Sequence, residues 1–466
     1  MDIKNPNSTR SMFADTPTLI DDAVSLDSRI EREFAPARRL TWDDYRTLIL
    51  SALGGALEYY DFVIFIFLAQ PLAQLFFPTE VPDWLRQIQT FGVFAVGFLV
   101  RPFGGILIAH LGDLLGRKRM FTVSILIMAA ATLGTGLLPV YHQVGVWAPL
   151  GLVFLRMVQG VAIGGEVSGA WVFVSEHTPA NRTGFACGTL SAGISAGILL
   201  GSAITATLAS AFASTEISNW AWRLPFFLGG ILGLCSVYLR RLLEETPIFT
   251  ELQAQKLLAT ELPVKVVVRD HGWSVVRAML LTAYLSATIV VILLMTPALL
   301  QKINGISMAV ATRANSVAML CVMIGCMVGG ALADRLGAGR PLTVGGILLG
   351  ISTWMFYTEG VTQPHLLLPL YASTGFFVGI VGGAHSYILV RSFPASVRFS
   401  GLSFSYNIAN AVFAGLTPLL IALLLPWVRL SHLYYVLAAC ALGCAIGIGL
   451  WRREKAGVSL SVIGRA

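Results

Sequence analysis

The sequence predicts an all-α membrane protein with twelve transmembrane helices in two pseudo-symmetric bundles of six, and three observations lead to this fold class. First, 56% of the 466 residues are hydrophobic and only 12% are charged, a composition that would give a soluble protein large exposed apolar patches. Second, apolar stretches of roughly 20 residues, the length that crosses a bilayer, recur along the chain. Third, a polar segment and a repeated pair of motifs divide these stretches six and six.

Helices are expected for every span, because only helices and closed barrels satisfy their backbone hydrogen bonds in lipid. The first six spans are predicted near residues 47–70, 88–111, 120–139, 147–174, 185–212 and 223–243. The other six are predicted near residues 275–300, 310–332, 341–358, 365–390, 400–425 and 431–451. The predicted organisation is a tail (1–46), a first bundle (47–243), a linker (244–273), a second bundle (274–451) and a tail (452–466).

The basic residues orient the chain and account for its net charge of +7. Most loop lysines and arginines fall on the side that also holds both tails and the linker. The loops on the other side have only Arg86, Lys302, Arg313 and Arg429. This asymmetry predicts cytoplasmic termini in a multi-pass protein of the cell (inner) membrane. The net positive charge is therefore expected to lie next to a lipid bilayer, and nucleic acid is not an expected partner.

Two motifs are repeated between the halves. The stretch GDLLGRKR at 112–119 parallels ADRLGAGR at 333–340, and EHTPANRTG at 176–184 parallels RSFPASVRFSG at 391–401. The two offsets are nearly equal, so one duplication explains both. Two related six-helix halves are the architecture of alternating-access transporters, whereas a membrane enzyme has no need of such a repeat.

These motifs resemble those of the major facilitator superfamily, whose loop signature G-x-L-A-D-R-x-G-R-K is met at 330–340 and more loosely at 109–119. Within the superfamily the chain is similar to the metabolite:proton symporters, which include proline/betaine, shikimate, α-ketoglutarate and citrate importers. The matching stretches are GALEYYDF (55–62), GFLVRPFGG (97–105), RMVQGVAIGGE (156–166), WRLPF (222–226), LEETPIF (243–249) and FPASVRFSG (393–401). Three positions depart from the family pattern: Leu114, Ala109 and Arg391 replace the usual arginine, glycine and glutamate.

Ionisable residues within a span are functional candidates by default, because burying a charge in lipid is costly. Glu58 and Asp61 are three residues apart in the first span and share one helical face. Each disfavours the charged form of the other, as burial does, so one of them can carry a proton near neutral pH. The alternative is a structural pair bonded to a nearby arginine.

Arg101 in the second span is a candidate substrate anchor, because the family resemblance points to it and a guanidinium forms a fork that suits a carboxylate. The alternative is that Arg101 is an internal partner for Glu58 or Asp61. The other candidates for substrate contact are Tyr59, Gln159, Arg223, Tyr406 and Asn407. Aromatic residues in this set are suited to a cation–π wall but also to simple packing, and Arg223 fits an interfacial anchor or an outer gate equally well.

The fourth span contains Arg156 and Glu166. The resemblance associates the arginine of R-x-x-Q-G with proton coupling, so both residues are candidates for that role. Ten residues of helix separate them, about 15 Å along the axis, so they cannot form one salt bridge. For Glu166 the alternative is that its neighbouring glycines only allow close packing against the first span.

Charged residues at the cytoplasmic ends are predicted to form contacts that differ between the two transport states, the alternative being a purely topological role for the arginines. They are Asp113, Arg117, Arg119, Glu176, Arg182, Asp334, Arg335 and Arg340. In the fifth span, the small residues of SAGISAGILLGS (191–202) predict a close helix crossing. This stretch lacks the G-P-x-x-G-G typical of drug:proton antiporters of the superfamily, which favours symport.

The resemblance implies a proton-coupled symporter that imports a small polar metabolite, a carboxylate or a zwitterion, by alternating access. The alternative is an exporter or antiporter of the same fold. A membrane-embedded enzyme is disfavoured because HExxH and paired histidine ligands are absent from the sequence, and a receptor is disfavoured because the tail is short. No nucleotide motif and no Cys or His ligand cluster is present, so no metal and no cofactor are expected. The expected partners are the substrate, protons and lipid, with a monomer as the default state.

Overall fold

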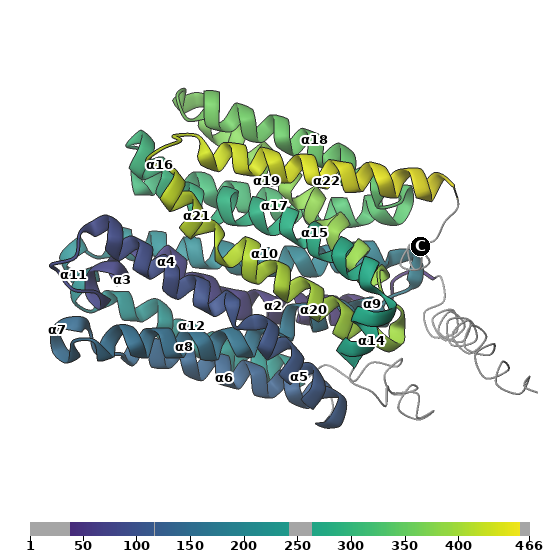
Figure 1. The fold of residues 1–466 in the computed structure, drawn as a ribbon, viewed down its shortest axis with the longest axis horizontal. Helices are drawn as coiled ribbons and strands as arrows, with labels where there is room; N and C mark the ends of the chain where they lie inside the picture. Colours follow the sequence, from purple (N-terminus) through teal and green to yellow (C-terminus); the bar gives the residue numbers. More distant parts are fainter. Residues whose placement is uncertain (1–37, 116, 242–262, 457–466) are drawn as a thin grey trace, which may run out of the picture.

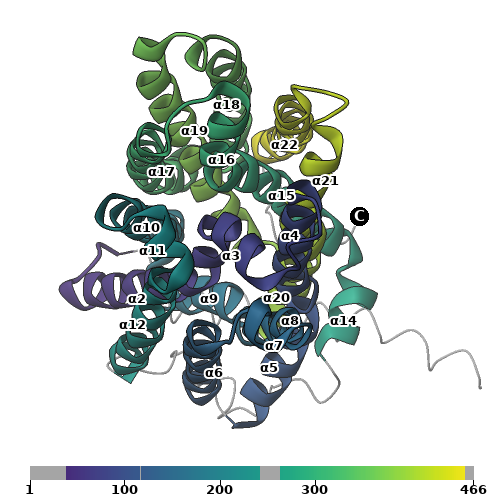
Figure 2. The same ribbon diagram turned by 90° about the vertical axis from the view of Figure 1, so that its left-hand side faces the viewer.

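The computed structural model describes residues 38–115, 117–241 and 263–456. These residues are helical or irregular and contain no strand. The helices run side by side along the long axis of the molecule, with those of the second half above those of the first in Figure 1 and Figure 2. Most of the predicted N-terminal tail, most of the linker and residues 457–466 of the C-terminal tail lie outside the described residues.

Six long helical runs make up the first half. They are α2 (Trp42–Phe67), α4 (Asp83–Leu99) continued by α5 (Arg101–Leu115), α6 (Arg117–Leu137), α8 (Trp147–Ile163) continued by α9 (Glu166–His177), α10 (Thr183–Ala211) and α12 (Leu224–Arg241). Short elements connect them: α3 (Ala69–Phe76), α7 (Tyr141–Val144), η1 (Ala180–Arg182), α11 (Ser214–Asn219) and η2 (Ala221–Arg223).

The second half repeats this plan. Its runs are α15 (Gly272–Ile289), η3 (Val290–Met295) and α16 (Thr296–Asn304); α17 (Met308–Leu336); α18 (Gly339–Met355) with η4 (Phe356–Gly360); α19 (Pro364–Arg391); α20 (Arg398–Asn410), η6 (Ala411–Gly415) and α21 (Thr417–Leu424); and α22 (Ser431–Lys455). The short α14 (Pro263–Asp270) precedes them, and η5 (Ala395–Val397) precedes α20.

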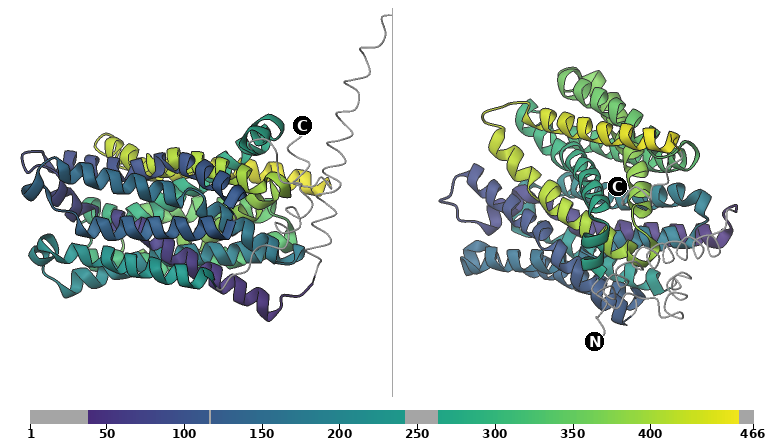
Figure 3. Two further views of the ribbon diagram at one scale, coloured as in Figure 1. Left: turned by 90° about the horizontal axis from the view of Figure 1, so that it is seen from below. Right: turned by 45° about the vertical axis from the view of Figure 1, so that its right-hand side comes forward.

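The predicted fold class is confirmed. Within the described residues, ten helical runs are long and apolar enough to span a membrane, and α6 contributes the shorter apolar helix Thr122–Leu137. The one predicted span not yet accounted for, 341–358, corresponds to α18, and each of the twelve predictions overlaps one run. The end of the molecule where α2 begins and α22 ends is called the predicted cytoplasmic end below, and the end with α3, α11 and α16 the predicted external end (Figure 1; Figure 3).

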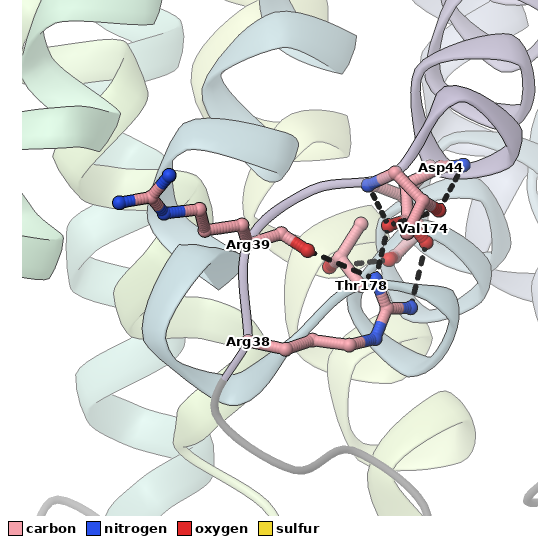
Figure 4. Close-up of polar contacts among 6 residues, drawn as sticks. Arg38, Arg39, Asp44, Val174 and Thr178 are labelled. Atoms are coloured by element: carbon pink, nitrogen blue, oxygen red, sulfur yellow. Dashed lines mark hydrogen bonds and ion pairs between the residues drawn. The ribbon is translucent and has the colours of Figure 1, made fainter.

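Local chemistry fixes the start of α2. The side chain of Thr41 accepts from the backbone N–H of Asp44, and the Asp44 carboxylate accepts from the backbone N–H of Thr41 at 2.7 Å, which together form a capping box. Arg38 binds both oxygens of the same carboxylate (Figure 4). The backbone N–H groups of Thr41 and Asp44, which a helix N-terminus leaves without helical partners, are therefore both paired where the first span begins.

Three spans of the second half contain π-helical turns, η3, η4 and η6, and prolines explain η3 and η6. Thr296-Pro297 opens α16 after η3, and Thr417-Pro418 opens α21 after η6. A proline lacks an N–H and crowds the preceding turn, so carbonyl groups there lose their helical partner. Thr296 Oγ1 donates to the Val291 carbonyl at 2.9 Å, and Thr417 Oγ1 donates to the Phe413 carbonyl. The same Thr-Pro device therefore recurs in the seventh and eleventh spans.

Glycines set the closest helix contacts. A Cβ on Gly193 or Gly197 of α10 would overlap the carbonyl oxygens of Ala52 or Ala56 in α2, which confirms the small-residue seam predicted at 191–202. Nearer the predicted cytoplasmic end, Gly184 of α10 meets Gly330 of α17 backbone to backbone. This second crossing joins the two halves, and Figure 2 shows α10 beside α17.

Gly197→Ala should lower the thermal unfolding midpoint of the detergent-purified protein, because the methyl group forces α2 and α10 apart. Overpacking of this kind costs about 1–3 kcal/mol. Gly449→Ala in α22 is the matched control, because a Cβ there has no neighbour within 4 Å. Equal midpoints for the two variants would contradict the packing account.

Candidate substrate and proton site

Two arginines share one aromatic ring near the middle of the second and fourth spans. The guanidinium carbon of Arg101 lies 4.1 Å from the centroid of the Phe62 ring, and that of Arg156 lies 4.6 Å from the same centroid. Further rings from the same half cover them: Phe98 over Arg101 at 4.1 Å, and Phe65 over Arg156 at 4.4 Å. The two buried charges are thus enclosed mainly by aromatic carbon.

Neither guanidinium has a carboxylate partner among the described residues. Both arginines are 1% exposed, and the Nε and Nη2 atoms of each are buried without a hydrogen-bond partner. Cation–π contacts contribute up to about 2 kcal/mol each when desolvated, whereas a buried charge costs several kcal/mol. This pair of cations is therefore a site that an anionic group would complete.

The break between α4 and α5 places Arg101, and glycines bring the fourth span against it. Pro102 follows Arg101 directly and lacks the N–H that a continuous helix would use. A Cβ on Gly160 would overlap the carbonyl of Gly97, and one on Gly164 would overlap that of Arg101. The glycines of the fourth span thus pack against the second span, so the predicted alternative of packing against the first span is wrong.

Gln159 orients Arg156. Its Oε1 accepts from Arg156 Nη1 at 2.9 Å, and its Nε2 donates to Thr132 Oγ1 of α6 at 2.8 Å. Arg156 Nη1 also donates to the Phe62 carbonyl at 3.3 Å. Gln159, predicted as a substrate contact, is therefore used here to hold an arginine.

Residues of the second half close over the arginines. Tyr406 of α20 interacts electrostatically with Arg101, as does Tyr59 of α2. The Tyr406 ring packs edge-on against Trp171 of α9 with centroids 5.1 Å apart. Asn407 Nδ2 donates to the carbonyl of Gly164 in the first half. Three of the predicted substrate residues, Arg101, Tyr59 and Tyr406, are thus brought together, and Asn407 joins the halves beside them.

The two carboxyls of the first span face α12. Ser236 Oγ of α12 donates to Glu58 Oε1 at 3.0 Å. A Cβ on Gly229 of α12 would overlap Asp61 Oδ1, which is buried without a hydrogen-bond partner among the described residues. No described ion pair joins Asp61 to Arg101 or Arg156. Asp61 thus lies against α12 without a described ion pair to either arginine, although Asp61 and Phe62 are adjacent in the sequence.

Two other candidates lie apart from this group. Arg223 stacks on Trp222 at 4.4 Å, and its Nη2 donates to the Leu138 carbonyl at the end of α6 at 3.1 Å. Glu166 is 1% exposed and begins α9, directly after the turn that ends α8. The described contacts of Arg223 therefore match those of an interfacial anchor, one of the two alternatives to a substrate contact.

Asp334 connects the halves at the predicted cytoplasmic end. Its two carboxylate oxygens accept from the backbone N–H groups of Gly184 at 2.7 Å and Phe185 at 2.8 Å, in the first turn of α10. Arg391, which replaces the family's glutamate, donates from Nη2 to the Ala180 carbonyl at 2.8 Å and so also crosses between the halves. These contacts, with the Gly184–Gly330 crossing, hold this end closed.

The remaining residues predicted for the cytoplasmic end are less informative. Glu176 is buried, Arg182 is partly buried, and Arg335 is exposed. Arg340 lies over the Trp451 ring at 5.8 Å. Asp113 lies in α5 and Arg117 and Arg119 in α6, but their side chains lie outside the described part of the structure.

A pocket lies toward the predicted external end, between the halves. It measures about 420 Å³ and is lined by α2, α3, α4 and α10 from the first half and by η3, α16, α17 and α21 from the second. None of the predicted proton or substrate residues lines it. A pocket at the predicted external end, together with a cytoplasmic end closed by the Asp334 and Gly184–Gly330 contacts, describes an outward-facing arrangement.

Two halves of six helices are the architecture of alternating-access transporters, and the comparisons with known proteins agree. The sequence matches the Major Facilitator Superfamily over residues 51–418, and the chain belongs to this superfamily. Its relatives are transporters, so the enzyme alternative is set aside.

Individual relatives show which transporters of the superfamily the chain is similar to. The chain is 30% identical over 423 residues, 86% of this chain and 82% of the relative, to the glycine betaine/proline/ectoine/pipecolic acid transporter of Dickeya dadantii. It is 30% identical over 426 residues (87% and 83%) to the proline/betaine transporter of Salmonella typhimurium. Its fold is similar to that of a proton:xylose symporter bound to 6-bromo-6-deoxy-D-glucose, with a TM-score of 0.73 at 16% identity over 88% of this chain and 95% of that chain. The predicted resemblance to metabolite:proton symporters is confirmed.

Sequence reasoning missed two features of this region. Phe62, which both arginines contact, directly follows Asp61 in GALEYYDF, but a phenylalanine in an apolar span has no signal of its own. Lys302 lines the external pocket, although the sequence used it only to assign topology. The sequence could have singled out Lys302 because it is one of only four basic residues in the predicted external loops.

Asp334→Asn should open the predicted cytoplasmic end more often. Asparagine removes the charge that accepts two backbone N–H groups, and a charge-assisted hydrogen bond contributes roughly 1.5–3 kcal/mol, enough for a shift of about tenfold or more in a two-state equilibrium. Cys187 of α10 is fully buried beside this contact. In a variant that keeps only this cysteine, maleimide labelling should rise. Arg335→Gln, at an exposed neighbouring residue, is the control. Equal labelling of both variants would show that the Asp334 contact does not hold the cytoplasmic end closed.

Proposed function

We propose that this transporter imports a small carboxylate-bearing zwitterion together with protons, by alternating access. The observation that carries the proposal is the pair of buried guanidiniums, Arg101 and Arg156, that lack a described carboxylate partner where the halves meet. An ionised carboxylate supplies the missing acceptors in a fork geometry. The named substrates of the relatives, among them betaine and proline, share a carboxylate and a cationic nitrogen, which supports the zwitterion class.

Dicarboxylates are the second candidate, because two uncompensated cations also suit a dianion. Uptake of labelled glycine betaine, proline and succinate into proteoliposomes, with and without an imposed proton gradient, separates the two classes. Loading the same probes inside the vesicles tests the export alternative. Proton-driven accumulation of a zwitterion supports the proposal, whereas transport of succinate alone, or efflux driven by inward protons, contradicts it.

Asp61 is the proposed proton carrier. In the outward-facing arrangement it is 2% exposed and has an unpartnered buried oxygen, surroundings that favour the neutral, protonated carboxyl. Glu58, with its Ser236 hydrogen bond, is the second carboxyl of the pair. Opening toward the cytoplasm then exposes Asp61 to water, where the charged form is favoured and the proton leaves. Arg156 and Glu166 remain proposed contributors to this coupling.

The remaining assignments complete the proposal. The termini and the linker face the cytoplasm in the inner membrane, the bundles extend over 47–243 and 274–451, and the chain works as a monomer. The charged contacts of the predicted cytoplasmic end, with Asp334 among them, close the substrate path in the outward-facing state.

Arg101→Lys should raise the KM for the transported zwitterion by at least tenfold, because an ammonium cannot offer two parallel N–H groups to a carboxylate. Initial rates of uptake in proteoliposomes measure this. Arg86→Lys, at an external arginine on α4, is the control. An unchanged KM for Arg101→Lys would show that Arg101 is only a structural charge.

Asp61→Asn should abolish proton-driven accumulation, because the amide cannot carry a proton. Exchange of labelled for unlabelled substrate across the vesicle membrane should continue, since the amide fits the same space. Asp83→Asn, at an exposed external carboxylate on α4, controls for loss of charge. Normal accumulation in both Asp61→Asn and Glu58→Gln would end the proton-carrier proposal.

A further inference from the structure

The external pocket has a chemical character distinct from the arginine site. Among the described residues that line it, Lys302 of α16 is the one charged group, and no carboxylate is present. Carboxamides surround it: Gln301 beside Lys302 in α16, Gln70 in α3 and Gln87 in α4. A single ammonium with amide donors and no competing acid favours a carboxylate ligand.

The residues of the first half that line the pocket favour a cationic group instead of a carboxylate. Phe67 of α2 and Phe91 of α4 line the pocket, and the face of a phenyl ring attracts a cationic nitrogen. Hydroxyls of Ser202 and Thr205 in α10 lie on the same side. The ammonium belongs to the second half and the rings belong to the first, so one small zwitterion in the pocket would contact both halves at once.

The size and setting of the pocket fit such a ligand. A volume of about 420 Å³ falls in the range of small-molecule sites, roughly 300–1,000 Å³. Its wall includes Leu294 and Met295 of η3 and Pro297 of α16, the turns where the seventh span departs from regular helix. A wall at a π-helical turn and a proline can bend with less cost than a straight helix.

We propose that this pocket is an external loading site, separate from the arginine site, that captures a zwitterionic amino-carboxylate with its carboxylate toward Lys302 and its cationic nitrogen toward Phe67 and Phe91. This proposal rests on the proposed zwitterion transport and adds a second position on the path. The bound solute draws α16 toward α2 and α4, and the seventh span bends at η3. The solute then passes to Arg101 as the external end closes.

Two variants test the pocket by initial-rate uptake of glycine betaine. Lys302→Gln should raise the KM about three- to tenfold with an unchanged maximal rate, as expected for a group that captures substrate before the slow step. Phe91→Leu should also raise the KM for glycine betaine, but not that for succinate, which has no cationic nitrogen. Lys302→Arg, which keeps the charge, should stay near wild type and shows that the site tolerates substitution.

The matched control is Arg313→Gln, because Arg313 is an exposed external cation beside the lining residue Thr312 but does not itself line the pocket. Equal KM changes in Lys302→Gln and Arg313→Gln would mean that only the surface charge matters, which overturns the proposal. An unchanged KM in Lys302→Gln, or a lower maximal rate with the same KM, overturns it as well.

Equilibrium binding separates this proposal from the proposed function. In purified full-length Arg101→Lys, weakened at the deeper site, glycine betaine should still bind, and adding Lys302→Gln should remove that residual binding. Choline, which lacks a carboxylate, should bind equally with and without Lys302. If the wild-type chain transports neither glycine betaine nor proline, the proposed function fails. The external site is judged separately: loss of the residual binding on adding Lys302→Gln supports it, and persistence of that binding refutes it.

Discussion

Burial of Arg101 and Arg156 against the ring of Phe62 is the constraint around which the centre of this transporter is arranged. Several features serve that contact: the proline after Arg101 that breaks the second span, the glycines that bring the fourth span against it, and the Gln159–Thr132 bridge that fixes Arg156. Aromatic rings offset only part of the desolvation cost. The guanidiniums are therefore partly compensated and still have unpaired hydrogen-bond donors, which the proposed carboxylate substrate would use.

The placement of Asp61 against α12, without a described ion pair to the arginines, changes how coupling can work. In a direct exchange, the proton and the substrate would compete for one salt bridge. Here Asp61 faces α12, while Phe62, the next residue of α2, lies between the arginines. In the proposed mechanism α2 is the shared element, because any rotation of this helix moves the carboxyl and the ring together. Coupling of this kind needs a rigid element with two arrangements and no direct contact between the two sites.

The two ends of the molecule are built differently. At the predicted cytoplasmic end the halves meet through backbone contacts at glycines and through the Asp334 carboxylate. These contacts either form fully or are lost, which suits a two-state closure. Toward the predicted external end the seventh span contains the π-helical turn η3 beside Thr296-Pro297, and the eleventh span contains η6 beside Thr417-Pro418, where Gly415 packs against Phe98 nearer the arginines. In both turns a threonine hydroxyl is already the partner of a backbone carbonyl. Bending there costs fewer hydrogen bonds, so this end can close gradually around a solute.

The sequence by itself determined the fold class, the twelve spans, the duplication and the presence of charged residues inside the spans, of which Glu58, Asp61, Arg101, Arg156 and Glu166 are buried. These follow from local rules: lipid requires about 20 apolar residues for each helix, and a charge inside a span is rare enough to stand out. Tertiary structure alone decided the partners of those ions. Glu58 and Asp61 share a helical face in the sequence, but only the packing of α12 decides that Ser236 meets Glu58 and that Gly229 and Gly233 meet Asp61. Phe62 and Lys302 gain their importance from the neighbours they meet across other helices, and such contacts depend on the relative rotation of packed helices, which spacing within one helix does not specify.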